Sequence, residues 1–474
     1  MVLSYSLQVL LVILRENFSI KFNISNATKL FDKMFHINYD TFIKKEPTYL
    51  VERISIAVNS LYMFISSSLT NIISSLVIIT VSLIIICTIR IDLAIFFFIT
   101  VPINYFGYKF LNKELQKRCE VMQNDTSTGY KNIIGICKNV DYIKQLGSYS
   151  DILNIINSSL EKIYSSMANV NRYAQSMSTS LKMFNYLVQN ITFIWLSINV
   201  LIGHNNIENI IIVSILLPIF FNALSNLTSA NIEIRDLQSS NNFIKNELDQ
   251  CLENNGTIII NKINKIYINL TNFILDETQC PLNITGEFVK GDIVYVSGVS
   301  GSGKSTFIKL IPRFRACNNI LIDDINLNEI DIYSLRNRIS YVPQEPTIFP
   351  LSIRENIALG KSDSKINWDS IEKNGLIQPI LKGKTLDTIV FENGSNLSGG
   401  EKQRISLCRE LLNNSDILLL DEITSNIDSE SSSDIYKSLV ENSKDKIIFI
   451  ISHDKNIRQF CNKQISIIPF NNCT

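Results

Sequence analysis

The stretch Ile72–Ile89 carries no charged residue and is long enough to cross a lipid bilayer. Helices of soluble proteins normally keep a polar face, so a helix of this length without a single charge favours a lipid surrounding. We therefore predict a membrane-spanning helix here, with a core helix of a soluble protein as the alternative. Further spans are predicted at Leu93–Tyr108, Phe184–Ile202 and Ile210–Leu224, and a partial one at Val2–Leu14.

Basic residues gather in the two long connections between these stretches. The first connection holds Lys21, Lys29, Lys33, Lys44, Lys45 and Arg53, and the second holds Lys113, Lys117, Arg118, Lys131, Lys138, Lys144, Lys162 and Arg172. The two short connections carry only Arg90 or, at Gly203–Asn209, no Lys or Arg. Because basic loops stay in the cytoplasm, both long connections and everything from about Ser225 onward are predicted to be cytoplasmic.

Composition excludes several classes of site. Lys plus Arg and Asp plus Glu number 44 each, so the formal net charge is +0, which argues against a nucleic-acid partner held by bulk charge. The nine Cys residues are scattered without metal-ligand spacing and are expected to be reduced thiols.

A glycine-rich loop follows an apolar strand in the C-terminal half. The predicted strand Ile293–Ser297 runs into Gly298–Thr306, which fits the phosphate-loop pattern G-x-x-x-x-G-K-[ST]. We expect the backbone and helix start to cradle phosphates, Lys304 to contact the β- and γ-phosphates, and the Ser305 hydroxyl to hold Mg²⁺. The nucleotide-binding residues of this loop are Gly298, Ser300, Gly301, Ser302, Gly303, Lys304, Ser305 and Thr306.

Two acidic residues end a second apolar strand, Ile417–Asp421. Asp421 fits a Mg²⁺-holding role, and Glu422 stands where a carboxylate can polarise an attacking water. The alternative is a strand that happens to end in two solvated acids. Downstream of a phosphate loop, this pattern favours nucleotide hydrolysis.

The segment Leu397–Arg404, with the letters LSGGEKQR, lies between these motifs and resembles the signature sequence of the ATP-binding-cassette (ABC) family. The resemblance implies that Ser398, Gly399 and Gly400 grip the γ-phosphate of ATP bound to an opposite subunit. Gln is usual in the family where this chain has Glu401.

Other landmarks of the family follow in the expected order. Gln344 in Tyr341–Gln344 resembles the Q-loop glutamine, which implies contacts with Mg²⁺ and water. Asp428 resembles the D-loop aspartate, and His453 after strand Ile447–Ile451 resembles the switch histidine that contacts the γ-phosphate. Phe273 lies where the family keeps an aromatic that stacks on adenine, with a core Phe as the alternative.

The resemblance covers nearly the whole chain and implies an exporter-type half-transporter. The expected fold is an all-α transmembrane domain, residues 1–255 without the first helix, followed by an α/β P-loop domain, residues 256–474 with a shortened tail. Two cytoplasmic regions, Tyr49–Leu61 and Asp125–Gly135, fall where the family has its short coupling helices.

The expected function is ATP-driven export, with ATP and Mg²⁺ bound between two subunits and Glu422, Gln344 and His453 as catalytic residues. Expected partners are a second half-transporter, identical or related, the lipid bilayer and a transported substrate of unassigned class, and the expected location is the plasma membrane. Two alternatives stay open: a soluble ABC ATPase, and a degenerate or truncated subunit that does not transport.

Overall fold

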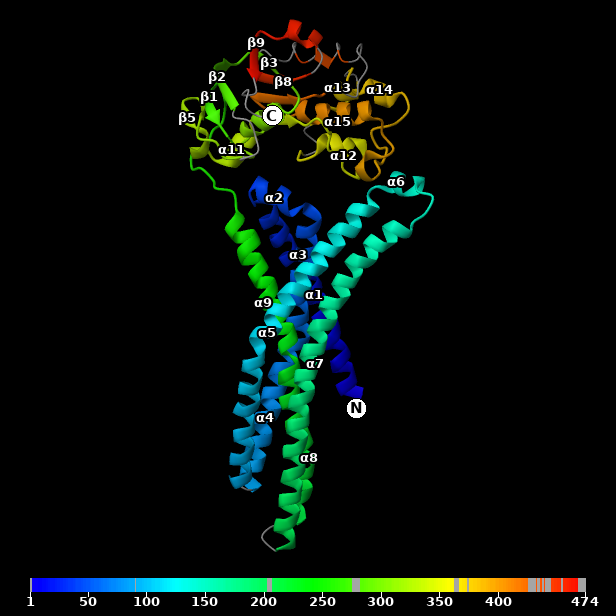
Figure 1. The fold of residues 1–474 in the computed structure, drawn as a ribbon, viewed down its shortest axis with the longest axis vertical. Coiled ribbons are helices and arrows are strands. Elements are labelled where there is room, and N and C mark those ends of the chain that lie inside the picture. Colours follow the sequence, from blue (N-terminus) through cyan, green and yellow to red (C-terminus); the bar gives the residue numbers. More distant parts are fainter. Residues whose placement is uncertain are drawn as a thin grey trace. The chain divides into compact units, whose positions relative to one another are not determined.

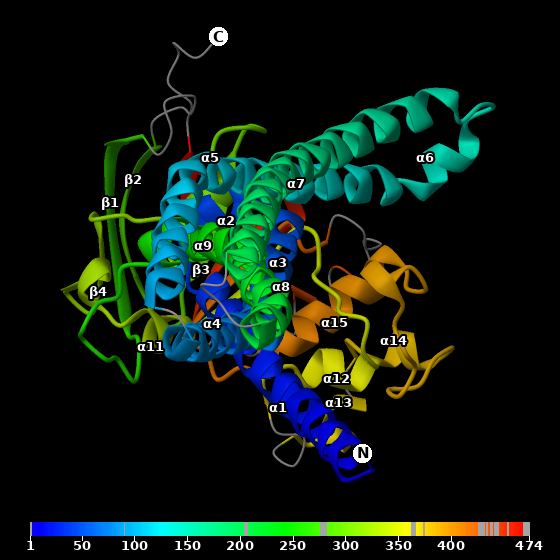
Figure 2. The same cartoon turned by 90° about the horizontal axis from the view of Figure 1, so that it is seen from below.

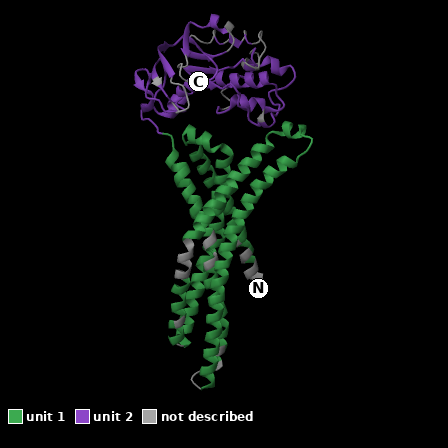
Figure 3. Cartoon of the chain, viewed as in Figure 1, with its two compact units in different colours: residues 1–253 green, residues 254–474 purple. Residues whose placement is uncertain are grey.

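The computed structural model describes residues 2–89, 91–202, 207–274, 282–361, 366–372, 375–424, 432, 435–436, 439, 445–452 and 455–467. The chain forms two compact units, Met1–Glu253 and Asn254–Thr474 (Figure 3). The boundary falls just before Gly256, where the sequence predicts the second domain to begin.

Unit 1 is a bundle of long helices (Figure 1). Helices α5 and α7 run side by side and are joined through the short helix α6 (Figures 1 and 2). The elements are α1 (Val2–Phe35), α2 (Tyr39–Lys45), α3 (Pro47–Met63), the π-helical turn η1 (Phe64–Ser68), α4 (Leu69–Ile89), α5 (Ile91–Cys137), α6 (Val140–Gln145), α7 (Ser150–Leu201), α8 (Ile207–Ser229), α9 (Asn231–Phe243), and the turns η2 (Ile244–Leu248) and η3 (Asp249–Cys251).

Helix α4 shows how the bundle packs. Its buried residues are Ser75, Ile79, Ser82 and Ile86, which recur every three or four positions and so lie on one face. Of these, Ile79 and Ile86 belong to a hydrophobic cluster that includes Phe97 of α5, Leu196 of α7 and Phe220 of α8. Small polar residues on the buried face let the helices approach closely, as is common between helices in membranes.

One continuous helical stretch within the described residues, Pro47–Ile89, is long and apolar enough to cross a membrane. Shorter apolar stretches lie at Ile91–Asn104 and Ile211–Leu227. The predicted span Phe184–Ile202 ends α7 and does not pass the same test, because Asn185, Gln189 and further amides lower its hydropathy.

The two short helices of unit 1 lie elsewhere than predicted. Tyr49–Leu61 lies inside α3 and Asp125–Gly135 inside α5, whereas the short helices in the turns are α2 and α6. Local signals set these boundaries: the Asn38 side chain caps α2 by accepting from Thr41 N–H at 2.9 Å, and Pro47 occupies the first turn of α3. The family resemblance placed the two regions by their order along the chain, which does not mark where helices begin and end.

Unit 2 contains two sheets in its described part. An antiparallel sheet has the order β2-β1-β4-β5, and a parallel sheet has the order β6-β7-β8-β3-β9. The strands are β1 (Lys265–Phe273), β2 (Leu282–Val289), β3 (Ile293–Gly298), β4 (Ile320–Ile322), β5 (Ile325–Asn326), β6 (Ile339–Val342), β7 (Ile417–Asp421), β8 (Ile447–Ile451) and β9 (Lys463–Ile467).

Helices pack on the parallel sheet from both sides. Helix α10 (Lys304–Leu310) packs with β1, β3 and β8 in one core, where the buried ring of Phe449 meets Phe288 and Phe307 edge-on. The second core joins β7 and β8 to α12, α14 and α15. The further helices and turns are η4 (Leu327–Glu329), α11 (Ile332–Arg336), α12 (Ile353–Ala358), α13 (Trp368–Glu372), α14 (Gln378–Leu381), η6 (Glu392–Gly394), α15 (Gly399–Leu411) and η7 (Lys455–Phe460).

Strands β3 and β7 are parallel in this sheet, with β8 between them, so their carboxyl ends lie at the same edge. Gly298 ends β3 and Asp421 ends β7. Ligands of open parallel sheets bind outside the carboxyl ends of the strands. The fold therefore brings the glycine-rich loop and the acidic pair together, although they are far apart in the sequence.

Candidate nucleotide-binding site

The loop after β3 depends on glycines. Gly301 and Gly303 have φ of 81° and 91°, in the left-handed region that side chains rarely enter. A Cβ at Gly298 would lie 2.7 Å from the backbone oxygen of Ile467 on the neighbouring strand β9. The loop can therefore turn tightly above the sheet. Its backbone N–H groups and those at the start of α10 then form a favourable site for phosphate.

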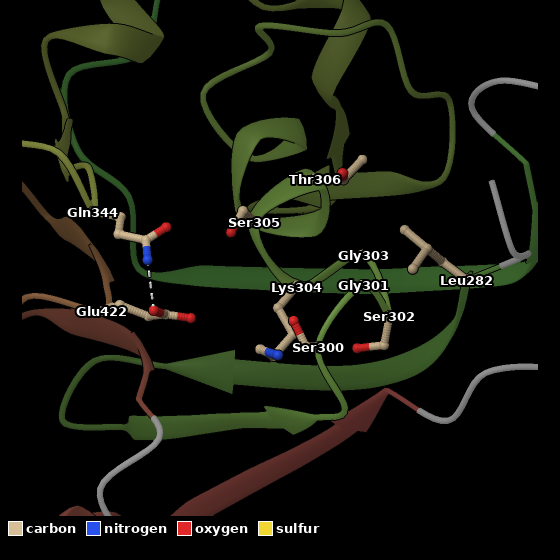
Figure 4. Close-up of a pocket in the computed structure, with 10 residues that line it drawn as sticks. All are labelled: Leu282, Ser300, Gly301, Ser302, Gly303, Lys304, Ser305, Thr306, Gln344 and Glu422. Carbon is tan, nitrogen blue, oxygen red and sulfur yellow. Dashed lines mark hydrogen bonds between the residues drawn. The ribbon is translucent and has the colours of Figure 1, made fainter. Parts of the chain in front are cut away.

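A cavity of about 530 Å³ opens over this loop. Figure 4 shows the described residues that line it: Leu282, Ser300, Gly301, Ser302, Gly303, Lys304, Ser305, Thr306, Gln344 and Glu422. All eight residues of the predicted loop site except Gly298 are in this lining, and Gly298 ends the strand below it. Leu282, at the start of β2, was not predicted, because its distance in sequence from the loop gives no signal of proximity.

Lys304 is buried and folds back on the loop. Its Nζ donates to the carbonyl oxygens of Gly298 and Val299, each at 3.0 Å. These two carbonyls hold the ammonium beside the cavity, where it can exchange them for phosphate oxygens. A Lys acts here as a compact charge with several donors.

Ser305 and Asp421 come together as the sequence predicts. Ser305 Oγ donates to Asp421 Oδ1 at 3.1 Å, and the Tyr341 hydroxyl donates to Asp421 Oδ2 at 3.4 Å. Burial raises the pKa of the Asp421 carboxyl above its ordinary value and the Glu422 carboxylate raises it further, while the hydrogen bonds from Ser305 and Tyr341 lower it.

The hydroxyl of Ser305 and the carboxylate of Asp421 suit Mg²⁺, a hard cation that prefers oxygen ligands. No group of three or more His, Cys, Asp or Glu residues in the described part of the chain could hold a metal ion alone. Mg²⁺ commonly binds through one or two carboxylates together with substrate phosphates, and the donors here fit that pattern.

Glu422 and Gln344 face each other in the cavity (Figure 4). Gln344 Nε2 donates to Glu422 Oε2 at 2.8 Å. Glu422 has a φ of 50°, unusual for a residue with a side chain, and its N–H donates to Ile451 O at 3.0 Å. Such strained backbone concentrates at functional sites, because the surrounding structure must hold it.

Ser398, Gly399 and Gly400 are absent from the described lining of this cavity. Ser398 caps α15 instead, and Gly399 and Gly400 form its first turn, where helix geometry leaves N–H groups without partners inside the helix. Within one chain, the signature segment and the phosphate loop therefore do not meet in this cavity.

Three further predicted residues are not placed at the cavity by the described part of the chain. Phe273, at the end of β1, is partly buried against the hydrophobic core and is not among the described lining residues. Asp428 and His453 lie outside the described residues. The adenine-stacking role of Phe273 and the roles of the other two stay predictions.

Comparison with protein families gives two matches on this chain. Residues 1–224 match the ABC transporter transmembrane region, and residues 282–425 match the ABC transporter model. The chain belongs to the ABC transporter family. The predicted fold class is confirmed: a helical transmembrane domain precedes an ABC ATPase domain.

Curated relatives of this ABC transporter chain include three that cover different shares of its length. The transport/processing ATP-binding protein ComA of Streptococcus pneumoniae is 25% identical over 98% of this chain and 65% of its own length. The lactococcin-G-processing and transport ATP-binding protein LagD of Lactococcus lactis is 28% identical over 70% of this chain and 49% of its own length. A probable ABC transporter ATP-binding/permease protein of Haemophilus influenzae is 35% identical over 45% of this chain and 39% of its own length. The chain thus spans less than two thirds of each.

A solved structure of a bacterial Atm1-family ABC exporter with ATP bound has the same fold. It superposes with a TM-score of 0.87 over 98% of this chain and 84% of its own, at 20% sequence identity. The likeness extends through both the helical and the sheet-containing units.

Proposed function

We propose that this chain is one half of an ATP-driven exporter, in which two such chains hydrolyse ATP at sites shared between their ATPase domains. Residues 1–255 form the membrane domain and 256–474 the ATPase domain, which lies in the cytoplasm of a cell whose plasma membrane holds the transporter. The partner is a second copy or a related half-transporter, and the transported substrate is of unassigned class.

The observation that carries this proposal is the convergence of hydrolytic groups on the phosphate loop. Lys304, Ser305, Gln344 and Glu422 line one cavity, and Asp421 bonds to Ser305 at its edge. The loop and Lys304 bind the phosphates. Ser305 and Asp421 would hold Mg²⁺, which would supply positive charge next to the phosphate oxygens.

Glu422 and Gln344 then position the attacking water. The Glu422 carboxylate accepts a hydrogen bond and is available to take a proton, while the Gln344 amide fixes its orientation at 2.8 Å. A general base must lie within hydrogen-bond reach of the proton that it abstracts, and both groups face the cavity (Figure 4). His453, after β8, is proposed to contact the γ-phosphate.

The separation of α15 from the cavity favours a site shared between chains. Ser398, Gly399 and Gly400 present a helix N-terminus suited to phosphate, but not to the nucleotide of their own chain. We infer that they and Asp428 complete the site of a partner. ATP then joins the two domains, and hydrolysis releases them, which moves the membrane helices.

The test is ATP hydrolysis by the full chain in lipid nanodiscs. Glu422→Gln should lower turnover at least about 100-fold while ATP stays bound, because it removes a base but keeps the shape of the site. Lys304→Ala should weaken ATP binding itself. Glu329→Gln, an exposed glutamate distant in sequence from these motifs, is the matched control and should leave turnover unchanged. Wild-type turnover in Glu422→Gln would refute the role of Glu422.

A further inference from the structure

Glu401 places a carboxylate in the first turn of α15, where the signature of the family usually has a neutral Gln. A carboxylate is favourable at a helix N-terminus, because the helix dipole is positive there. The same N-terminus is the part of the chain that the proposed function offers to the γ-phosphate of a partner's ATP. The charge that stabilises the helix would therefore repel its ligand.

Each carboxylate oxygen of Glu401 has its own partner. Oε2 accepts from the Ser398 backbone N–H at 2.7 Å, and the Glu401 N–H donates to Ser398 Oγ at 3.2 Å, which together form a capping box. Oε1 accepts from Lys384 Nζ at 2.6 Å. The cap and the ion pair thus use different atoms, and one can be removed without the other.

The fold holds Lys384 in place for this contact. Lys384 follows α14 in a turn where its N–H donates to Ile380 O at 3.1 Å, and Ile380 is fully buried. The side chains of Lys384 and Glu401 are only 25% and 20% exposed, so solvent screens their attraction less than that of a surface pair. Burial alone would raise the pKa of Glu401, but hydrogen bonds from Lys384 and Ser398 hold it below its ordinary value.

We propose that Lys384 is a positioning residue for ATP hydrolysis: it neutralises Glu401, so that the capped turn Ser398–Gly400 can receive the γ-phosphate of the partner's ATP. The inference rests on the proposed function. On this proposal, Lys384 is needed only when residue 401 carries a negative charge. A Gln at position 401 could accept the hydrogen bond from the Ser398 N–H and would be neutral.

The experiment is a double-mutant cycle on the full chain in nanodiscs. Lys384→Met should lower ATP turnover about fivefold, Glu401→Gln should stay within about twofold of wild type, and the double variant should return to the Glu401→Gln level, since contacting charges couple. Lys382→Met, an exposed lysine on the same turn, is the matched control and should leave turnover unchanged.

Binding of radiolabelled ADP separates positioning from folding. ADP lacks the γ-phosphate, so its affinity should be equal in all variants if Lys384 acts through that phosphate. A double variant as impaired as Lys384→Met, full turnover in Lys384→Met, or ADP affinity that falls together with turnover would each overturn the proposal. If instead the wild type does not hydrolyse ATP, or Ser398→Arg leaves turnover intact, the proposed function itself fails.

Discussion

The two units use the same apolar residues in opposite ways. In unit 2, Ile, Leu and Phe side chains such as those of Ile448, Phe449 and Ile450 are buried in the sheet. In unit 1, helix α4 turns Val77 and Ile84 outward, 57% and 61% exposed, and buries Ser75 and Ser82. Apolar side chains are therefore buried in the sheet of unit 2 but are partly exposed on helix α4 of unit 1.

The difference shows which solvent each unit meets. In water, exposed apolar surface is costly and drives burial, as in unit 2. In lipid that drive is absent, and helices associate through small residues, close packing and hydrogen bonds between side chains. Unit 1 follows the second pattern in the α4 region, which agrees with its match to an ABC transporter transmembrane region.

The largest expected effect tests buried against exposed aromatic rings. Phe449→Ala should destabilise unit 2 by about 3–5 kcal/mol, because it empties space at the meeting point of Phe288 and Phe307. Phe98→Ala, at a ring that is 67% exposed in α5, should cost less than about 1 kcal/mol, since lipid can fill the space. Denaturant unfolding of the full chain in nanodiscs measures the loss of stability in both variants. Equal losses would contradict the contrast between a buried core in unit 2 and a lipid-facing surface in unit 1.

A charge placed on each exposed surface gives the next effect. Val77→Lys should oppose membrane insertion by about 3 kcal/mol, the cost of Lys at the centre of a spanning helix. Ile259→Lys, at a side chain in unit 2 that is 72% exposed, should change stability by less than about 0.5 kcal/mol. Carbonate extraction of membranes scores insertion. Unchanged insertion of Val77→Lys would show that this face of α4 does not meet lipid.

Amides in the bundle should give a smaller effect. The buried Asn104 Nδ2 donates to Asn185 Oδ1 at 3.1 Å, which links α5 to α7. Asn185→Leu should lower the stability of unit 1 by about 0.6 kcal/mol, the average for such bonds in a membrane protein. Asn190→Leu, exposed on the same helix, is the control and should be neutral or stabilising. Thermal unfolding in nanodiscs measures the stability of both variants. Equal changes in the two variants would show that the hydrogen bond between Asn104 and Asn185 does not stabilise unit 1.

The smallest expected effect concerns pH dependence in unit 2. In the metal-free protein, burial raises the pKa of the Asp421 carboxyl, so Asp421 loses its charge as pH falls through that pKa. Tyr341→Phe removes a hydrogen bond at 3.4 Å that lowers this pKa, so Asp421 should become protonated at a higher pH than in the wild type. An NMR titration of the ¹³C-labelled Asp421 carboxyl without Mg²⁺ or nucleotide measures the shift. A titration that moves to lower pH would contradict the assignment.

Local patterns in the sequence predicted much of unit 2. The strand, glycine-rich loop and helix around Lys304 were recognisable because each depends on neighbouring residues. The link from Gln344 to Glu422 and the ion pair of Lys384 with Glu401 were not, because both depend on how distant segments fold together. The roles assigned to Phe273, Asp428 and His453 are still predictions.

In unit 1 the sequence located the apolar helices better than the turns between them. Ile72–Ile89 forms most of α4, and Ile210–Leu224 lies within α8. The short helices α2 and α6 were missed; single residues set the boundaries around α2, where Asn38 caps the helix and Pro47 begins α3. Most of Phe184–Ile202 lies at the end of α7, where amides such as Asn185 and Gln189 make it less apolar than Pro47–Ile89, and its role as a membrane span stays a prediction.

Mixing two inactive variants tests the central claim most directly. Lys304→Ala disables the phosphate loop but keeps Ser398, while Ser398→Arg disables the signature turn but keeps the loop. A mixed pair carries one intact shared site, so co-expression of the two should restore up to about a quarter of wild-type ATP turnover, since half of the pairs are mixed and each has one of two sites. Copurification through two different tags confirms the mixed pairs. If such pairs form and stay as inactive as either variant alone, the site is not shared between chains.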